Sequence, residues 1–331
     1  MSRQWNTLGY ACMALCVVST YAQPSAPHPR ILGGENSMEG QVPFYGHIYF
    51  KSDMYSPCGG SLISDEWFLT TTWCLMNNGE GNNSTAIPIP ADEMFVDLGG
   101  ANGKAPHRFG IAEVIHHEQY KVTGEMEILE NDIALIRLDK KVKLTDNINV
   151  VKIYCGKLQV NDSMTVAGKG MVDLFKETFA DTLQVVTLAV TEPAVCKSLV
   201  DTYEDPNGPL ICLGSQDGRG HCVGDLGGPM YTLNANNQSV LVGLASQVVS
   251  AEPALVTCAG KGSVNTYTHV YHYIDWISKN TGIPKEQFLD STQESGQTST
   301  NIAESSIESP QANDQTPTNS TESSNNNPSE N

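Results

Sequence analysis

The feature that most constrains the fold of this chain is a series of short β-prone runs between turn residues, spread over residues 31–284. Runs such as 43–50, 67–70, 132–138 and 240–245 are rich in β-branched and aromatic residues, which favour the pleated, half-buried surface of a sheet. Almost no helical periodicity separates them. Many short strands without intervening helices predict an all-β domain, built as a barrel or a sandwich.

One helix is expected, at the end of this zone. Over residues 270–277 apolar side chains recur at steps of three and four, which is the spacing of an amphipathic helix. The composition then changes. Residues 285–331 consist mainly of Ser, Thr, Asn, Gln and Glu, with almost no large apolar side chains. Such a segment cannot bury enough surface to offset the entropy of ordering it, so we predict a disordered, acidic tail.

Residues 1–22 are expected to be a secretory signal peptide. Arg3 supplies a positive charge, an apolar run follows, and small residues ending at Ala22 suit cleavage. A membrane anchor is disfavoured because the run is too short to span a bilayer. Residues 23–30 form a short Pro-rich propeptide that ends in Arg30. We therefore expect a mature chain that is secreted and extracellular, with no membrane span.

The 331 residues carry a formal net charge of −18. Such an acidic balance argues against nucleic acid and anionic membranes as partners, because both would be repelled. An extracellular compartment permits disulfides. Of nine cysteines, Cys12 and Cys16 lie in the signal peptide, so the mature chain keeps seven, an odd number that leaves at least one outside any internal disulfide.

Five motifs resemble those of the chymotrypsin/trypsin family of serine proteases, and the resemblance covers about residues 30–284. In chain order they are the activation site at 30–34, the segments that carry the catalytic His, Asp and Ser at 58–74, 131–135 and 224–229, and the closing helix at 273–277. Each motif alone is weak, but five in this order and at family-like spacing are specific. The resemblance implies two packed six-stranded β-barrels, with the active site in the cleft between them.

The resemblance also implies a degenerate catalytic triad. The family uses a serine hydroxyl that attacks, an imidazole that takes its proton and a carboxylate that orients the imidazole. Asp132 matches the carboxylate, but Trp73 occupies the imidazole position and Leu226 the hydroxyl position. Indole is a donor only, and leucine has no nucleophile. Because triad members act as a unit, we expect no enzymatic activity. Asp132 is then expected to bind the Trp73 indole N–H or local backbone donors.

Two histidine positions offer alternative chemistry. His221 lies five residues before Leu226, in the stretch that lines the specificity pocket of the family, and a role in the pocket wall is favoured over a rescue of catalysis. His116 and His117 could form part of a metal site, but the family has a surface loop of similar composition there, which favours a solvated loop. We expect no metal and no cofactor.

The pocket positions depart from trypsin. Gly220 stands where trypsin-like enzymes carry the Asp that binds Arg or Lys. In the run Ser246, Gln247 and Val248, the glutamine stands where the family usually has Trp. The resemblance therefore implies no specificity for basic side chains.

The activation switch of the family is kept. Cleavage after Arg30 would free the amino group of Ile31, and the family buries that group against the Asp that precedes the catalytic Ser, here Asp225. A buried ion pair requires both partners. Cleavage is therefore expected to reshape the region 220–228. The alternative is an inherited remnant that is never cut.

Family spacing also implies three disulfides, which join Cys58 to Cys74, Cys196 to Cys212, and Cys222 to Cys258. Cys155 has no counterpart in this scheme, so we expect either a thiol or a bond to another chain. Sequons for N-glycosylation occur at Asn82, Asn83, Asn161, Asn237 and Asn319.

These observations lead to one functional hypothesis and two alternatives. The first is a non-catalytic, secreted protease homologue of the kind frequent in insects, acting as a cofactor, decoy or scaffold in a proteolytic cascade, immunity or reproduction. Its partner would be an extracellular protein, such as a protease, an inhibitor or a cascade component, with Cys155 available for a covalent link. The alternatives are an endopeptidase with unconventional residues and an inert structural glycoprotein.

Overall fold

The computed structural model describes residues 31, 33–52, 58–77, 86–100, 106–124, 127–173, 178–214, 218–251, 258, 260 and 262–292. The expectations for the signal peptide, the propeptide with Arg30, the sequons Asn82, Asn83 and Asn319, and the tail beyond residue 292 lie outside these ranges. No helix among the described residues is both long and apolar enough to cross a membrane.

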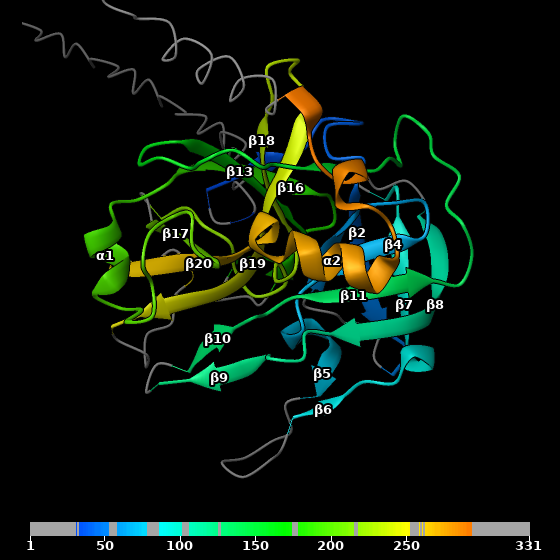
Figure 1. Cartoon of the computed structure of the whole chain (residues 1–331), viewed down its shortest axis with the longest axis horizontal. Helices are drawn as coiled ribbons and strands as arrows, with labels where there is room; N and C mark the ends of the chain where they lie inside the picture. Colours follow the sequence, from blue (N-terminus) through cyan, green and yellow to red (C-terminus); the bar gives the residue numbers. More distant parts are fainter. Residues whose placement is uncertain are drawn as a thin grey trace, which may run out of the picture.

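The N-terminal half forms a closed barrel of six antiparallel strands in the order β11-β4-β3-β2-β7-β8 (Figure 1). Alternation explains its filled interior, because every second side chain of a strand faces the same side. Phe68 and Ile136, for example, are cross-strand partners, and both are fully buried. The strands are β2 (Tyr45–Phe50), β3 (Cys58–Leu62), β4 (Trp67–Thr70), β7 (Met94–Leu98), β8 (His107–His116) and β11 (Ala134–Leu138).

The C-terminal half is an eight-stranded sheet in the order β1-β16-β13-β18-β19-β20-β17, with β12 also paired to β19. Its strands are β1 (Glu35–Asn36), β12 (Lys152–Ile153), β13 (Ser163–Gly168), β16 (Gln184–Ala189), β17 (Leu210–Gly214), β18 (Pro229–Leu233), β19 (Ser239–Ser250) and β20 (Ser263–His269). A second closed six-stranded barrel was expected. Among the described residues the two ends of the sheet are linked by a single long bond, from the Thr191 N–H to the Cys212 carbonyl at 3.5 Å, which does not make a ladder.

Further short strands and helices lie outside the barrel and the sheet. Six of these short strands pair as three hairpins: β5 (Met76–Asn77) with β6 (Ile87–Pro88), β9 (Lys121–Thr123) with β10 (Ile128–Glu130), and β14 (Met171–Asp173) with β15 (Thr178–Phe179). The helices are α1 (Pro193–Lys197) and α2 (Ile274–Thr281), with 3-10 turns η1 (Trp73–Leu75), η2 (Ala91–Glu93), η4 (Val270–Tyr273) and η5 (Lys285–Gln287).

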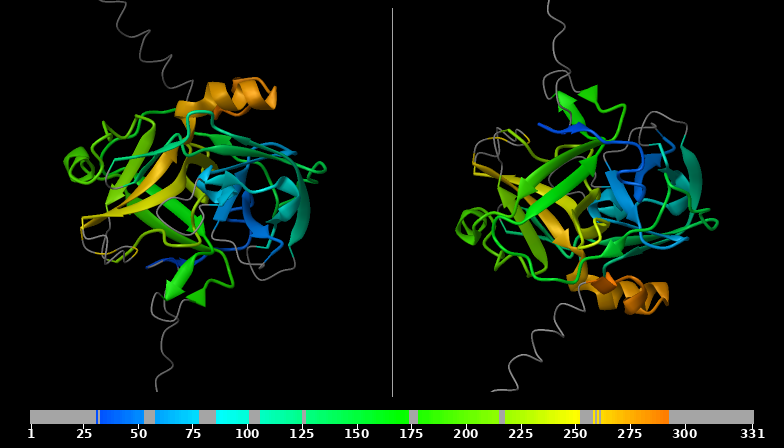
Figure 2. Two further views of the ribbon diagram at one scale, coloured as in Figure 1. Left: turned by 90° about the horizontal axis from the view of Figure 1, so that it is seen from below. Right: turned by 90° about the horizontal axis from the view of Figure 1, so that it is seen from above.

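The expected closing helix over 270–277 begins as the 3-10 turn η4 and continues as α2. It ends at Gly282, which adopts a left-handed φ of 71° and donates its N–H to the Ser278 carbonyl at 3.0 Å. Glycine suits this helix end because it has no Cβ to clash. Figure 2 shows α2 lying along the outside of the two halves.

The folded domain extends further than the predicted boundary at residue 284. Residues 285–292 pack on the domain and do not belong to the tail. Phe288 is only 2% exposed, and its carbonyl accepts the Ile153 N–H at 2.8 Å. Asp290 returns its N–H to the Ile153 carbonyl at 3.0 Å. One aromatic side chain and two backbone bonds thus anchor a segment whose average composition is that of a tail.

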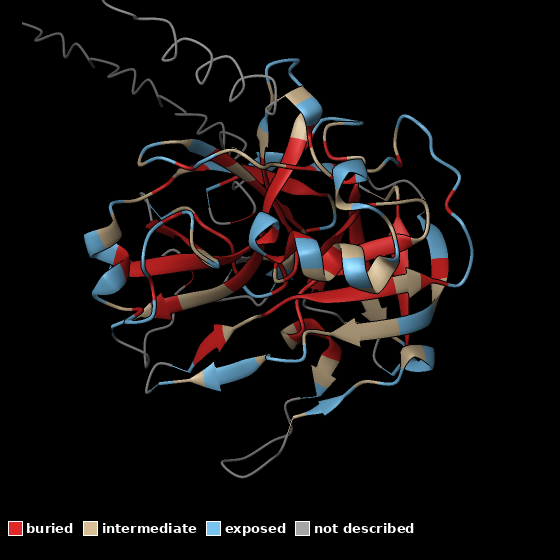
Figure 3. Ribbon diagram, viewed as in Figure 1, coloured by how far each residue is buried: buried red, intermediate tan, exposed pale blue. Residues whose placement is uncertain are grey.

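One hydrophobic cluster spans the two halves, and buried residues run through the strands of both (Figure 3). Leu69 and Leu135 of the barrel belong to the same buried cluster as Leu241 and Leu244 of the sheet. A common core of this kind fixes the halves against each other, because separating them would expose apolar surface to water. The segments that lie between the halves are therefore held from both sides.

All three expected disulfides are present. They join Cys58 to Cys74, Cys196 to Cys212, and Cys222 to Cys258. Cys155 takes part in none of them, and its Sγ lies 3.9 Å from the carbonyl oxygen of Asp290.

Candidate functional site

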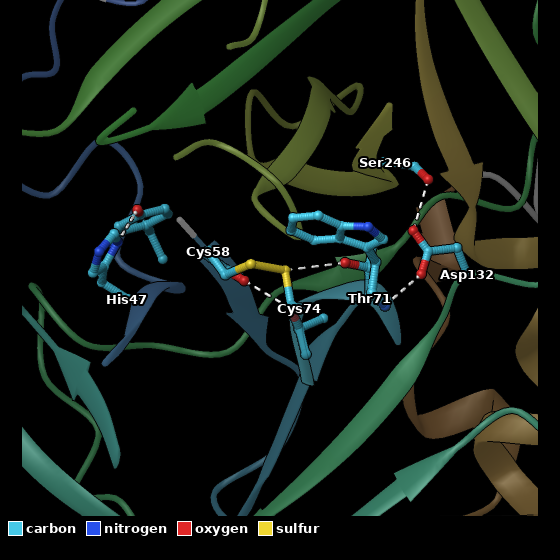
Figure 4. Close-up of a disulfide and its surroundings, with 10 residues drawn as sticks. His47, Cys58, Thr71, Cys74, Asp132 and Ser246 are labelled. Atoms are coloured by element: carbon cyan, nitrogen blue, oxygen red, sulfur yellow. Dashed lines mark hydrogen bonds between the residues drawn. A yellow bond between two sulfur atoms is a disulfide. The ribbon is translucent and has the colours of Figure 1, made fainter. Parts of the chain in front are cut away.

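Asp132 lies in the turn before β11, where the two halves meet, and is only 1% exposed. Its Oδ1 accepts the backbone N–H of Trp73 at 2.8 Å, and its Oδ2 accepts the hydroxyl of Ser246 at 2.7 Å (Figure 4). Burial raises the pKa of Asp132 to about 6, and these hydrogen bonds only partly offset the effect. From the sequence, the donor to Asp132 could have been the Trp73 indole or a backbone N–H. In the structure the backbone N–H of Trp73 donates to Oδ1 of Asp132.

The main chain around Asp132 is held as firmly as its carboxylate. Thr268 of β20 donates its hydroxyl to the Asp132 carbonyl at 2.8 Å. Thr72 donates its hydroxyl to the carbonyl of the next residue, Ile133, at 2.7 Å. Both threonines are buried, so these bonds face little competition from water. The residue at the orienting position is therefore fixed from both halves.

Trp73 opens η1 and has a half-buried side chain that packs against the barrel core. It lines a groove of about 550 Å³ together with apolar residues such as Phe50, Met76 and Ile87. Indole has one N–H donor and no acceptor that could take a proton at neutral pH. This position therefore offers a partner an apolar surface and a single donor.

Leu226 lies in the turn between Cys222 and Gly228. Its carbonyl accepts the Gly59 N–H at 2.7 Å, and its half-buried side chain packs against the same barrel cluster as Trp73. Cys58, the neighbour of Gly59, is bonded to the cysteine that follows Trp73. A disulfide beside Trp73 and a backbone bond from Leu226 thus tie both residues to one strand of the barrel, β3.

Asp225 is fully buried beside Leu226. Its Oδ1 accepts the Gly170 N–H at 2.7 Å, and its Oδ2 accepts the Cys222 N–H at 2.8 Å. Burial raises the pKa of Asp225 to about 7, against the lowering effect of these two bonds. Ile31 is likewise fully buried, in the core of the C-terminal half. Both residues of the expected activation pair are therefore inside the domain.

Gln247 connects the two halves across the site. Its Oε1 accepts the Leu129 N–H at 3.3 Å, and its Nε2 donates to the Glu127 carbonyl at 3.0 Å. Between these two residues, Ile128 packs into a cluster of the C-terminal half. The β9–β10 hairpin is thereby attached to β19 at the position where a Trp was expected by resemblance. Val248, the next residue, is half-buried.

His221 is fully buried, and its ring contacts that of Tyr267 edge to face with centroids 5.0 Å apart. Burial lowers the pKa of His221 to about 3, although the nearby Gln247 backbone acts to raise it. A histidine that stays neutral to so low a pH and has no solvent access is unsuited to accept and release a proton during turnover.

His117 packs against the closing helix. Its ring centroid lies 5.3 Å from that of Tyr273 and 5.1 Å from that of Trp276. Within the described ranges no three His, Cys, Asp or Glu side chains come together as metal ligands. Of the two sequons inside these ranges, both Asn161 and Asn237 are exposed.

Sequence reasoning missed one strand of the site, β20. Thr266 and Thr268 donate hydroxyls to the carbonyls of Gln247 and Asp132, while Asn265 and Tyr267 alternate with them along the strand. The available signal was a β-prone run, residues 263–268, in which every side chain except that of Val264 carries a polar group, because a strand with polar groups on both faces must meet partners on both. No motif identified which neighbours they would meet.

A six-stranded barrel and a sheet that share a core, with a buried aspartate held at their junction, define a chymotrypsin-like architecture. Residues 31–277 match the family model described as Trypsin, and the chain belongs to this family. Transmembrane protease serine 11B of Homo sapiens is 28% identical over 77% of this chain and 56% of its own length. The proclotting enzyme of Tachypleus tridentatus is 27% identical over 76% of this chain and 66% of its own.

A third relative is phenoloxidase-activating factor 3 of Holotrichia diomphalia, which is 27% identical over 77% of this chain and 73% of its own length. The chain thus spans about half to three-quarters of these relatives.

Proposed function

We propose that this chain is a secreted, non-catalytic member of the trypsin family that binds and regulates an extracellular protein. One observation carries the proposal. Asp132 receives only a backbone N–H from the position of the catalytic base, whose side chain is the indole of Trp73. The position of the nucleophile is a leucine, Leu226. Peptide hydrolysis in this family requires a base and a hydroxyl at these two places.

The remaining machinery supports a binding role. The Asp132 hydrogen bonds, the disulfides and the buried Asp225 keep the frame of a protease, which presents a half-buried Trp73 beside an apolar groove. Tryptophan is enriched among residues that dominate protein–protein binding. His221 is the histidine nearest to Leu226 in sequence, and its burial and its pKa of about 3 disfavour unconventional catalysis through an imidazole.

The setting of this role is inferred from the relatives and the cysteines. Two relatives are named as a proclotting enzyme and a phenoloxidase-activating factor. Three disulfides suit an oxidising compartment, in keeping with the signal peptide expected at residues 1–22. We therefore place the chain in an extracellular proteolytic cascade, as a cofactor, decoy or scaffold for one of its components.

The test is covalent labelling of the purified mature chain with a fluorophosphonate, alongside hydrolysis of a panel of peptide and ester substrates. We expect no labelling and no turnover above that of heat-inactivated protein. Trypsin, labelled in parallel, serves as the positive control. Stoichiometric labelling at one residue of the folded chain would contradict the proposal.

A further inference from the structure

The position that sets specificity in trypsin-like enzymes has no space beside it in this chain. A Cβ atom built on Gly220 would lie 2.8 Å from Nδ2 and 3.0 Å from Oδ1 of Asn265. The carboxamide of Asn265 therefore rests directly against Gly220. Any side chain entering from a partner would have to displace it.

Two further side chains close the same region. His221 follows Gly220 in the chain, and its ring meets the Tyr267 ring edge to face at 5.0 Å. Tyr267 lies two residues after Asn265 on β20, so the two share a face of the strand. His221, Asn265 and Tyr267 are all 0% exposed. We call this group the closed chamber.

The closed chamber is polar but has no internal hydrogen bonds. Among the described residues, five of its atoms make no hydrogen bond of normal geometry: Nδ1 and Nε2 of His221, Nδ2 and Oδ1 of Asn265, and the hydroxyl of Tyr267. The Gln247 backbone lies near the His221 ring and interacts with it, but not at the distance and angle of a normal hydrogen bond. A buried polar atom without a partner costs about 1–3 kcal/mol, so five unpaired atoms in one place would be a heavy burden for a stable domain. Buried polar cavities of native proteins normally hold small molecules, chiefly water, that make two to four hydrogen bonds.

We propose that His221, Asn265 and Tyr267 turn the specificity pocket into a closed site for hydrogen-bonding guests the size of water, which admits no side chain of a partner. This inference deepens the proposed function and rests on it, because it defines how the partner is recognised. The partner docks on the outer surface beside Trp73 and leaves the closed chamber unoccupied by its own residues. The neutral imidazole, carboxamide and phenol together supply both donors and acceptors to such a guest.

The first experiment probes access to the chamber. Benzamidine, phenol and butylamine imitate basic, aromatic and aliphatic side chains, and saturation-transfer NMR detects their binding to the full mature chain. We expect none of them to bind the wild type, and at least one to bind after Asn265→Gly or His221→Ala. Binding to the wild type that these substitutions leave unchanged or weaken would overturn the proposal. The proposal would also be overturned if neither variant bound any probe, provided that circular dichroism showed both to be folded.

The second experiment tests the guest. Tyr267→Phe removes one hydroxyl without changing shape, and a guest bonded to it loses a partner, so we expect the thermal midpoint to fall by about 3–6 °C. The matched control is Tyr203→Phe, because the Tyr203 hydroxyl is also buried without a partner among the described residues, but its cluster holds no second unpaired polar atom that could bind a guest with it. Its midpoint is expected to stay or to rise. A rise for Tyr267→Phe would show that no guest occupies the chamber.

These outcomes are separate from a failure of the proposed function. Fluorophosphonate labelling reports on the region of Leu226, whereas neither chamber experiment involves Leu226 or Trp73. If the wild type were labelled by the fluorophosphonate but bound none of the three probes, the non-catalytic role would be refuted and the closed chamber would still be supported.

Discussion

The hydroxyl of Ser246 donates a hydrogen bond of 2.7 Å to Oδ2 of Asp132, and the two residues come from different halves of the molecule. Ser246 lies on β19 of the sheet, and Asp132 lies two residues before the start of the barrel strand β11. Both are nearly inaccessible to solvent. The bond therefore connects the halves where a protease would hold its catalytic imidazole, although no imidazole is there.

We expect Ser246→Ala to lower the free energy of unfolding by about 1–3 kcal/mol, because a buried carboxylate would lose one of its donors. Denaturant unfolding measures this change. Ser61→Ala is the matched control, since the Ser61 hydroxyl is fully buried but has no hydrogen-bond partner. Its loss is expected to be much smaller. If the two variants lost the same free energy of unfolding, the hydrogen bond from Ser246 to Asp132 would not be what stabilises the domain at this position.

The stability of the uncleaved chain is expected to fall as the pH rises from about 4 to about 7. The folded pKa values of Asp132 and Asp225 are raised to about 6 and about 7. In this window the folded chain holds protons that the unfolded chain has released, so their stabilising effect is complete below the ordinary pKa near 4 and is lost above the folded pKa. Thermal midpoints across this range measure the effect.

Asp225→Asn isolates one of the two groups. The difference in midpoint between wild type and variant is expected to drift in favour of the variant as the pH rises from 4 to 8, because only the wild type acquires the buried charge. A difference that is independent of pH would contradict the raised pKa of Asp225.

Cleavage after Arg30 is expected to stabilise the domain. The new amino group of Ile31 would give the buried carboxylate of Asp225 a positive partner, and paired buried charges are far better tolerated than single ones. Calorimetry of the chain before and after limited trypsin digestion measures the midpoint. The gain is expected to vanish in Asp225→Asn. Equal midpoints for the cut and uncut wild type would favour the inherited remnant.

We expect the double variant Trp73→His, Leu226→Ser to regain fluorophosphonate labelling without regaining peptide cleavage. The small probe needs only the base, the nucleophile and Asp132, whereas a peptide also needs a pocket for its side chain. Adding Asn265→Gly is expected to permit slow hydrolysis of at least one substrate in a mixed peptide library. Efficient cleavage by the double variant alone would show that the pocket is open.

Gln247→Ala is expected to loosen the β9–β10 hairpin from the sheet. Two side-chain bonds are lost at about 1 kcal/mol each, which together correspond to roughly a 30-fold increase in local opening. Hydrogen exchange at the Leu129 amide reports it directly. Gln159→Ala, an exposed position of the same half that shortly precedes β13, serves as control. Unchanged protection of Leu129 would mean that the packing of Ile128 alone holds the hairpin.

Local sequence patterns predicted the all-β architecture and carried the motifs of the family, because strand periodicity and motif spacing are properties of short segments. The three disulfides were implied by the resemblance to that family, and the structure contains all of them. The same patterns placed the domain boundary too early. Residues 285–292 look like a tail in composition, and they become part of the fold through the burial of Phe288 and the two backbone bonds to Ile153. A boundary that is set by contacts with a strand distant in sequence has no local signal.

The site was predicted less completely than the fold. Trp73, Asp132 and Leu226 lie in recognisable motifs, so their positions could be inferred along the chain. Asn265 lies in no motif. Its role follows from the contact of its carboxamide with Gly220, which is distant from it in sequence. Contacts between segments that are distant in sequence require the three-dimensional arrangement.

The donor that holds Oδ1 of Asp132 is a backbone amide, and every residue except proline supplies one at position 73. The carbonyl that ties Leu226 to Gly59 is equally independent of the side chain. Changing the side chain at either position therefore leaves these two backbone bonds in place, although the packing that Trp73 and Leu226 make against the barrel would change with it. The scaffold and the chemistry that it displays are thus specified by different atoms of the same residues.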